Sequence, residues 1–193
     1  MAPALDSFLV FAADLEMRPE QNLGALVGVY RQIGQSYVQL GDLVQAKKYL
    51  LKLNQIITQL GRRTANAPRM PNWMRQLESL RGDVVWAEGR LTDAENSFLA
   101  AIRQGEEAIR QLPVRQARGI FASPQVRAEQ TVDENQLKLS GVYLDQGRMD
   151  ESELLMREVL KRALTRDGRN SIMAGKTLNQ LAKVMLRRGR NAE

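Results

Sequence analysis

The chain has 193 residues, a formal net charge of +6 and 44% hydrophobic residues, a composition that suits one ordinary folded domain with a sizeable core. It contains no cysteine and no histidine, which excludes disulfides, cysteine nucleophiles, histidine general bases and zinc sites built on either residue. Abundant Leu, Ala, Arg, Gln and Glu, with few aromatic residues, favour helices over sheets.

The first predicted element is a helix near the start of the chain. One helical face is marked by five apolar residues, Leu5, Phe8, Leu9, Ala12 and Leu15. The apolar run 4–13 is too short to span a bilayer and has no basic segment before it, so we expect neither a membrane span nor a signal peptide. The compartment stays open, with the cytoplasm favoured.

Next along the chain, four glycines lie in matching surroundings: Gly41, Gly89, Gly147 and Gly189. Seven residues before each glycine is a small residue, namely Gly34, Gly82, Ser140 and Ala182. Four residues before each is an apolar residue, namely Tyr37, Val85, Tyr143 and Met185. Five residues after the first three glycines is another small residue: Ala46, Ala94 and Ser152.

This spacing predicts a repeated unit of helix, tight turn and second helix. Small residues midway along two antiparallel helices let the backbones approach closely. Glycine suits the left-handed residue that ends a helix. Such a pair cannot bury both of its faces alone and must stack on its neighbours. A generic helical bundle with chance glycines is the alternative, and the number of coincident positions disfavours it.

The pattern resembles the tetratricopeptide repeat over residues 26–59, 74–107, 132–165 and a truncated 174–193. The resemblance implies an all-α superhelical array of antiparallel helix pairs, with about three and a half repeats and an N-terminal helix in a single domain, 1–193. The 42-residue step between the last two glycines is similar to the long-helix repeats of kinesin light chain and of bacterial proteins. The family's early tryptophan and terminal proline are missing. Breaker-rich stretches at 61–71 and 113–124 predict loops between repeats.

No arrangement of residues indicates catalysis. The carboxylates of Glu106 and Glu107, and of Asp150 and Glu151, are adjacent in sequence and so face different sides of a helix. No glycine-rich phosphate cradle with a Lys-Ser or Lys-Thr ending is present. We therefore expect no enzyme activity, no cofactor and no metal site.

The resemblance implies instead that the first helices of the repeats line a concave groove for a peptide or partner protein. On each of these helices, the face next to the packing positions is expected to line the groove. Its residues include Arg31, Gln35, Gln39, Asp83, Trp86, Asn179, Lys183 and Arg187. Trp86 suits a binding hot spot, and a tryptophan packed into the core is the alternative. The Lys/Asn/Arg clamp that some members use to grip a carboxylate is not reproduced, which disfavours an adaptor for chaperone tails.

The leading interpretation is a protein-interaction scaffold. The similarity of the long repeats to those of bacterial proteins, and a fourth repeat that stops after its turn, indicate a fragment of a larger bacterial multi-domain protein. The alternative is a nucleic-acid-associated factor, because residues 157–193 hold ten Lys and Arg against three Asp and Glu, whereas the net charge before residue 31 is −3. That segment has no aromatic residue for base stacking, so nucleic acid is disfavoured.

The last predicted helix leaves an apolar stripe without the second helix of its repeat. The stripe consists of Leu178, Leu181, Met185 and Leu186. Exposed apolar surface of this kind tends to associate, so we expect a homodimer through the truncated C-terminal repeat, most simply a two-fold one.

Overall fold

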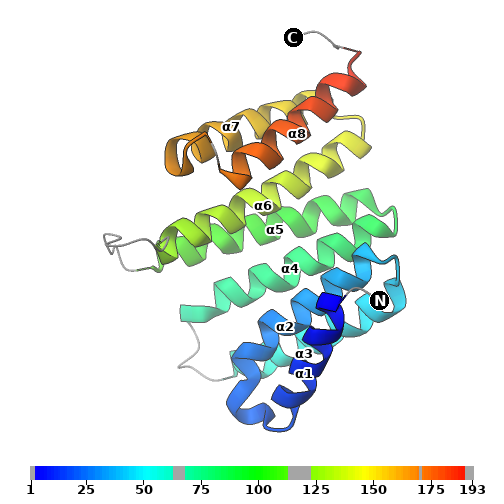
Figure 1. Cartoon of the computed structure of the whole chain (residues 1–193), viewed down its shortest axis with the longest axis vertical. Helices are drawn as coiled ribbons and strands as arrows, with labels where there is room; N and C mark the ends of the chain where they lie inside the picture. Colours follow the sequence, from blue (N-terminus) through cyan, green and yellow to red (C-terminus); the bar gives the residue numbers. More distant parts are fainter. Residues whose placement is uncertain (1–2, 63–67, 113–122, 170, 190–193) are drawn as a thin grey trace. The chain divides into compact units, whose positions relative to one another are not determined.

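The computed structural model describes residues 3–62, 68–112, 123–169 and 171–189, and these residues form eight helices and no strand (Figure 1). The helices are α1 Pro3–Glu16, α2 Pro19–Gln39, α3 Leu43–Gly61, α4 Met70–Ala87, α5 Leu91–Arg110, α6 Pro124–Asp145, α7 Met149–Asp167 and α8 Ile172–Arg187. The predicted all-α class is confirmed. The predicted loops 61–71 and 113–124 are shorter at their ends than expected, because Gly61 still belongs to α3, Met70 and Pro71 begin α4, and Pro124 begins α6. Residues 63–67 and 113–122 of these loops lie outside the described residues.

The chain divides into two compact units, residues 1–104 and 105–193. In the first unit α2 packs against α1, α3 and α4, and α3 also packs against α4. In the second unit α6 packs against α7 and α8, which also pack against each other. Within each unit, therefore, helices that are neighbours in sequence are neighbours in space. That one domain covers the whole chain stays a prediction.

Each helix pair reverses direction at one of the repeated glycines. Gly41, Gly89 and Gly147 have φ values of +76°, +77° and +79°, in the left-handed region that favours glycine. Around the first of them, Gly41 N donates to Val38 O at 3.1 Å and Asp42 N donates to Tyr37 O at 3.0 Å. This pair of hydrogen bonds is the Schellman motif, and it supplies donors to carbonyl groups that have no partner within the helix. The predicted left-handed turns are confirmed.

The small residues before these glycines lie where the packing is tightest. A Cβ atom on Gly34 would lie 2.7 Å from Leu80 Cδ2, and one on Gly82 would lie 2.6 Å from Phe98 Cε1. At the third repeat, the Ser140 and Ser152 hydroxyl groups are 2.6 Å apart and buried. The close contact at Gly34 is made by α4 of the next repeat, whereas the contact at Gly82 is made by α5 of its own repeat. The small residues therefore serve the packing both within and between repeats.

The N-terminal helix α1 packs on α2 through the predicted apolar face: Leu5, Ala12 and Leu15 are buried, and Phe8 and Leu9 are partly buried. A polar cluster fixes the end of the helix. Lys52 Nζ donates to Glu16 Oε1 at 2.8 Å, and the Tyr30 hydroxyl also donates to Glu16. The hydrogen bond from Lys52, and after it the bond from Tyr30, lowers the pKa of the Glu16 carboxyl. Burial, and then the hydrogen bond to Glu16, raises the pKa of Tyr30.

The turn glycines can be tested by two alanine substitutions of opposite expected sign. Neither a Cβ on Gly41 nor one on Gly28, an exposed glycine inside α2, would meet any atom within 4 Å. Gly41→Ala should lower the free energy of unfolding by about 1–2 kcal/mol, because alanine disfavours the left-handed conformation. Gly28→Ala should raise it by up to about 1 kcal/mol through helix propensity. Urea unfolding followed by the fluorescence of Trp73 and Trp86, both in the first unit, measures each change. Equal effects would contradict the conformational argument.

The Glu16 cluster predicts a stability effect that depends on pH. Because the folded-state pKa of Glu16 is lowered, its contribution is present above the unfolded pKa of about 4.3 and is lost as the pH falls through the folded pKa. Glu16→Gln should therefore lower the free energy of unfolding at pH 7, by less than about 1 kcal/mol since the pair is partly exposed. The difference from the wild type should vanish at acid pH. Asp14→Asn, at an exposed carboxylate of the same helix, is the control and should change stability by less than about 0.5 kcal/mol.

Candidate partner-binding faces

Three of the predicted groove residues meet where α2 lies against α4. The Arg31 guanidinium donates to Gln35 Oε1 at 3.2 Å, and Gln35 Nε2 donates to Asp83 Oδ2 at 3.1 Å. All three residues are half-buried, so they remain within reach of a ligand. Gln35 and Asp83 each lie six residues before a turn glycine, so equivalent positions of neighbouring repeats contact each other. The result is a polar row of guanidinium, amide and carboxylate groups.

Trp86 stands beside this row and is neither fully exposed nor fully buried. Its ring meets that of Phe98 on α5 edge to face, with centroids 6.1 Å apart and planes at 88°. Part of the indole is therefore held by the core, and the remainder is accessible. Gln39 lies exposed at the C-terminal end of α2. Such an anchored aromatic ring loses little freedom when a ligand packs on it.

The remaining predicted residues lie on α8 in the second unit. Arg187 Nη1 donates to the carbonyl oxygen of Leu144 at 2.6 Å, and its Nη2 donates to Asp145 Oδ1 at 3.0 Å. Arg187 and Asp145 each lie two residues before a turn glycine, so here too equivalent positions meet. Asn179 and Lys183 are exposed on the same helix. Each unit therefore holds its own set of predicted groove residues.

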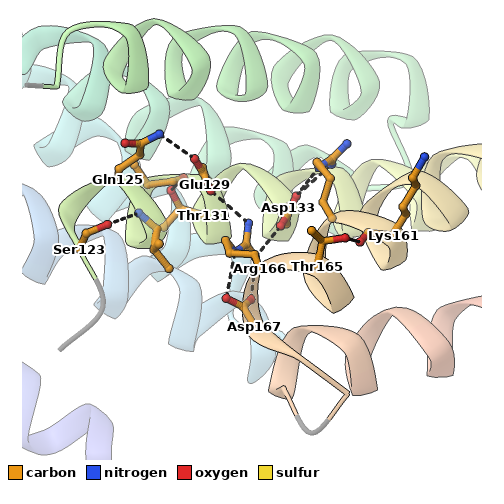
Figure 2. Close-up of polar contacts among 12 residues, drawn as sticks. Ser123, Gln125, Glu129, Thr131, Asp133, Lys161, Thr165, Arg166 and Asp167 are labelled. Carbon is orange, nitrogen blue, oxygen red and sulfur yellow. Dashed lines mark hydrogen bonds and ion pairs between the residues drawn. The ribbon is translucent and has the colours of Figure 1, made fainter. Parts of the chain in front are cut away.

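The sequence analysis missed a buried carboxylate in the second unit, Asp133 on α6, which is 1% exposed. Arg162 Nη2 donates to Asp133 Oδ1 at 2.9 Å. Arg166 Nη2 lies 2.9 Å from Asp133 Oδ2, as an ion pair without an aligned hydrogen bond, and it also donates to Asp167 Oδ2 at 2.8 Å (Figure 2). The bond to Asp167 is the first cause of the raised pKa of Arg166, and the Arg166 guanidinium lowers the pKa of Asp167. Two arginines thus compensate the buried charge.

A cavity of about 700 Å³ lies beside this cluster, within the second unit. Its wall holds both carboxylates and basic groups: Glu106, Glu129, Asp133 and Glu158 with Lys161, Arg162 and Arg166. Thr165 also lines the cavity, and its hydroxyl group donates to the carbonyl oxygen of Lys161 in the same helix at 2.9 Å. Charged groups of both signs therefore dominate the described wall.

One signal in the sequence could have located the buried charge. Asp133 lies fourteen residues before Gly147, and the equivalent residues before Gly41 and Gly89, which are Val27 and Arg75, are also buried. A charged residue at a repeat position that is buried predicts a buried charge that needs a partner. The partners could not be found in the same way, because Arg162 and Arg166 lie 29 and 33 residues further along the chain.

The basic residues of the C-terminal segment lie mostly against carboxylates. Six of the ten form ion pairs with acidic residues of the second unit: Arg157, Arg162, Arg166, Lys176, Arg187 and Arg188. Arg188, for example, pairs with both Asp150 and Glu153. The excess of positive charge along the sequence is therefore much smaller on the folded surface. Arg190 lies outside the described residues.

Repeated helix pairs, left-handed glycine turns and small residues at the close contacts together define a helical repeat protein. In a comparison with protein families, a tetratricopeptide repeat model matches residues 27–58, which covers most of α2 and α3. The match supports the resemblance to this family, and the long-helix type stays a prediction. Tetratricopeptide repeats mediate protein interactions, so the match also supports an interaction module. No curated protein matches the chain significantly.

No helix among the described residues is long and apolar enough to cross a membrane. In the same part of the chain, acidic side chains do not gather in a group of three that could hold a metal ion.

The Asp133 cluster predicts a large stability effect at one residue. Asp133→Asn should lower the free energy of unfolding by about 2–3 kcal/mol, because it leaves Arg162 and Arg166 without their buried counter-charge. The matched control is Asp145→Asn, which removes an exposed ion pair to Arg187 and should cost less than about 1 kcal/mol. Urea unfolding followed by far-ultraviolet circular dichroism measures both changes. Equal losses would show that burial of the pair does not matter.

Proposed function

We propose that the chain is a scaffold that binds a peptide segment of a partner protein along the exposed faces of the first helices of its repeats. The observation that carries the proposal is the polar row of Arg31, Gln35 and Asp83 next to the partly buried ring of Trp86. The tetratricopeptide match over α2 and α3 supports an interaction role in general.

The chemistry of this face suits a peptide backbone. The guanidinium of Arg31 and the amide of Gln35 offer donors and an acceptor, and Asp83 offers further acceptors. Because these groups already bond one another, their side chains are ordered before a ligand arrives, which reduces the entropy cost of binding. Trp86 then supplies apolar area for a side chain of the ligand.

On α8, Lys183 and Asn179 would extend the same recognition in the second unit, with Arg187 held in place by Asp145. A role in binding nucleic acid is less well supported, because the ion pairs of the C-terminal segment take up most of its positive charge. That the chain is a segment of a larger bacterial protein stays a prediction.

The test uses peptides selected from a random displayed library on the wild-type chain. Their affinities for the variants Arg31→Ala and Trp86→Ala are then measured by fluorescence anisotropy. Each variant should weaken binding at least about tenfold, the size of effect typical of a binding hot spot. Lys183→Ala shows whether the α8 face takes part.

The matched control is Arg103→Ala, which removes an exposed arginine from α5, away from the predicted face, and should leave the affinities unchanged. Circular dichroism of every variant shows that the helices are intact. If the selected peptides bind Arg31→Ala and Trp86→Ala as tightly as the wild type, the peptide site is not on this face and the proposal fails.

A further inference from the structure

A shallow groove runs between α7 and α8 in the second unit. Its volume is about 390 Å³, and its floor is formed by Leu160, Leu164 and Leu181. Lys161 and Arg157, the latter also ion-paired with Glu153, form the polar part of its wall, with Thr165 as a neutral neighbour and no carboxylate among the lining residues. The groove thus combines an apolar floor with a basic rim.

The adjoining face of α8 extends this apolar surface. Leu178 is 52% exposed and Leu186 is 65% exposed. Between them lies Ala182, which is also exposed, whereas Gly34, Gly82 and Ser140, the equivalent small residues, are all buried against a neighbouring helix. In the described part of the chain, α8 therefore presents a helix-packing face that the other three repeats cover. The groove and this face together are called the tail surface.

A second exposed apolar surface lies on α1 in the first unit, and the charged groups beside it are acidic, whereas those of the tail groove are basic. Val10 is 73% exposed and Phe11 is also exposed, although α1 buries its other face against α2. The charged groups on this side of the helix are the exposed carboxylates of Asp6 and Asp14. Helix α1 contains no basic residue. This acidic and apolar side of α1 is called the head surface.

We propose that a second copy of the chain places the head surface of its α1 on the tail surface, so that copies associate head to tail. The occupant follows from local charge: Asp6 and Asp14 are exposed carboxylates on the head surface, whereas the residues that line the tail groove include Arg157 and Lys161 and no carboxylate. A helix with Val10 and Phe11 facing the leucine floor would bring its carboxylates to the basic rim. The proposal concerns assembly and does not depend on the peptide-binding function.

Charge also distinguishes this arrangement from the two-fold dimer expected from the apolar stripe alone. Two tail surfaces facing each other would place two basic rims, with no carboxylate among the groove residues, in one interface, and like charges repel. A head-to-tail contact leaves one head and one tail open, so it adds further copies until the chain of copies closes or the protein is depleted. Its strength should fall as salt screens the two opposite charges.

The experiment blocks each surface separately in the full chain. Val10→Lys places a positive charge on the head, and Leu178→Asp places a negative charge on the tail. Both positions are exposed, so both variants should keep the circular dichroism of the wild type. In sedimentation velocity over a range of concentrations, the wild type should form dimers and larger species, and each variant alone should stay monomeric. A mixture of the two variants should form a one-to-one heterodimer and nothing larger, because one intact head then meets one intact tail.

Val44→Lys is the matched control, since Val44 is 78% exposed on α3 and lies on neither surface, and this variant should associate like the wild type. Three results would overturn the proposal. They are a wild-type chain that is monomeric at every concentration, a Val10→Lys variant that still dimerises, and a mixture of the two blocked variants that stays monomeric. The second result would point to the two-fold dimer through α8.

Discussion

The left-handed backbone at Gly41, Gly89 and Gly147 is the constraint on which the helix pairs depend. Each glycine ends one helix with the same pair of hydrogen bonds and so starts the next helix in the opposite direction. The small residues before the turns then allow the helices to approach as far as van der Waals contact permits. Where serine replaces glycine in the third repeat, the contact at Ser140 is kept through a buried hydrogen bond to Ser152.

Repetition of these turns also determines which side chains meet across neighbouring repeats. Gln35 and Asp83 are 48 residues apart, which is the spacing of Gly41 and Gly89, and they are hydrogen-bonded. Asp145 and Arg187 are 42 residues apart, the spacing of the last two glycines, and they form an ion pair. The helices, their turns and even these pairs are therefore predictable from the sequence, because all of them follow from one local pattern that recurs.

The Asp133 cluster shows where such prediction stops. Asp133 on α6 and its partners on α7 lie within one repeat, at positions that do not correspond to each other in the repeat pattern. Arginine side chains are long enough to reach several acceptors, so the choice among Glu129, Asp133 and Asp167 depends on packing in three dimensions. For the same reason the pairing of the basic segment could not be predicted from the sequence, because its counter-charges come from residues on α6 and α7 as far as 42 positions away in sequence.

Net charge and local surface therefore have to be judged separately in this protein. A polyanion is attracted by unpaired cations with open solvent in front of them, and most C-terminal arginines here already face a carboxylate. The groove between α7 and α8 is different, because its basic side chains border a floor of leucines. Phosphate groups gain nothing from an apolar floor, whereas an amphipathic helix gains from both the floor and the rim. The combination of the two chemistries in one place favours a helix as the occupant.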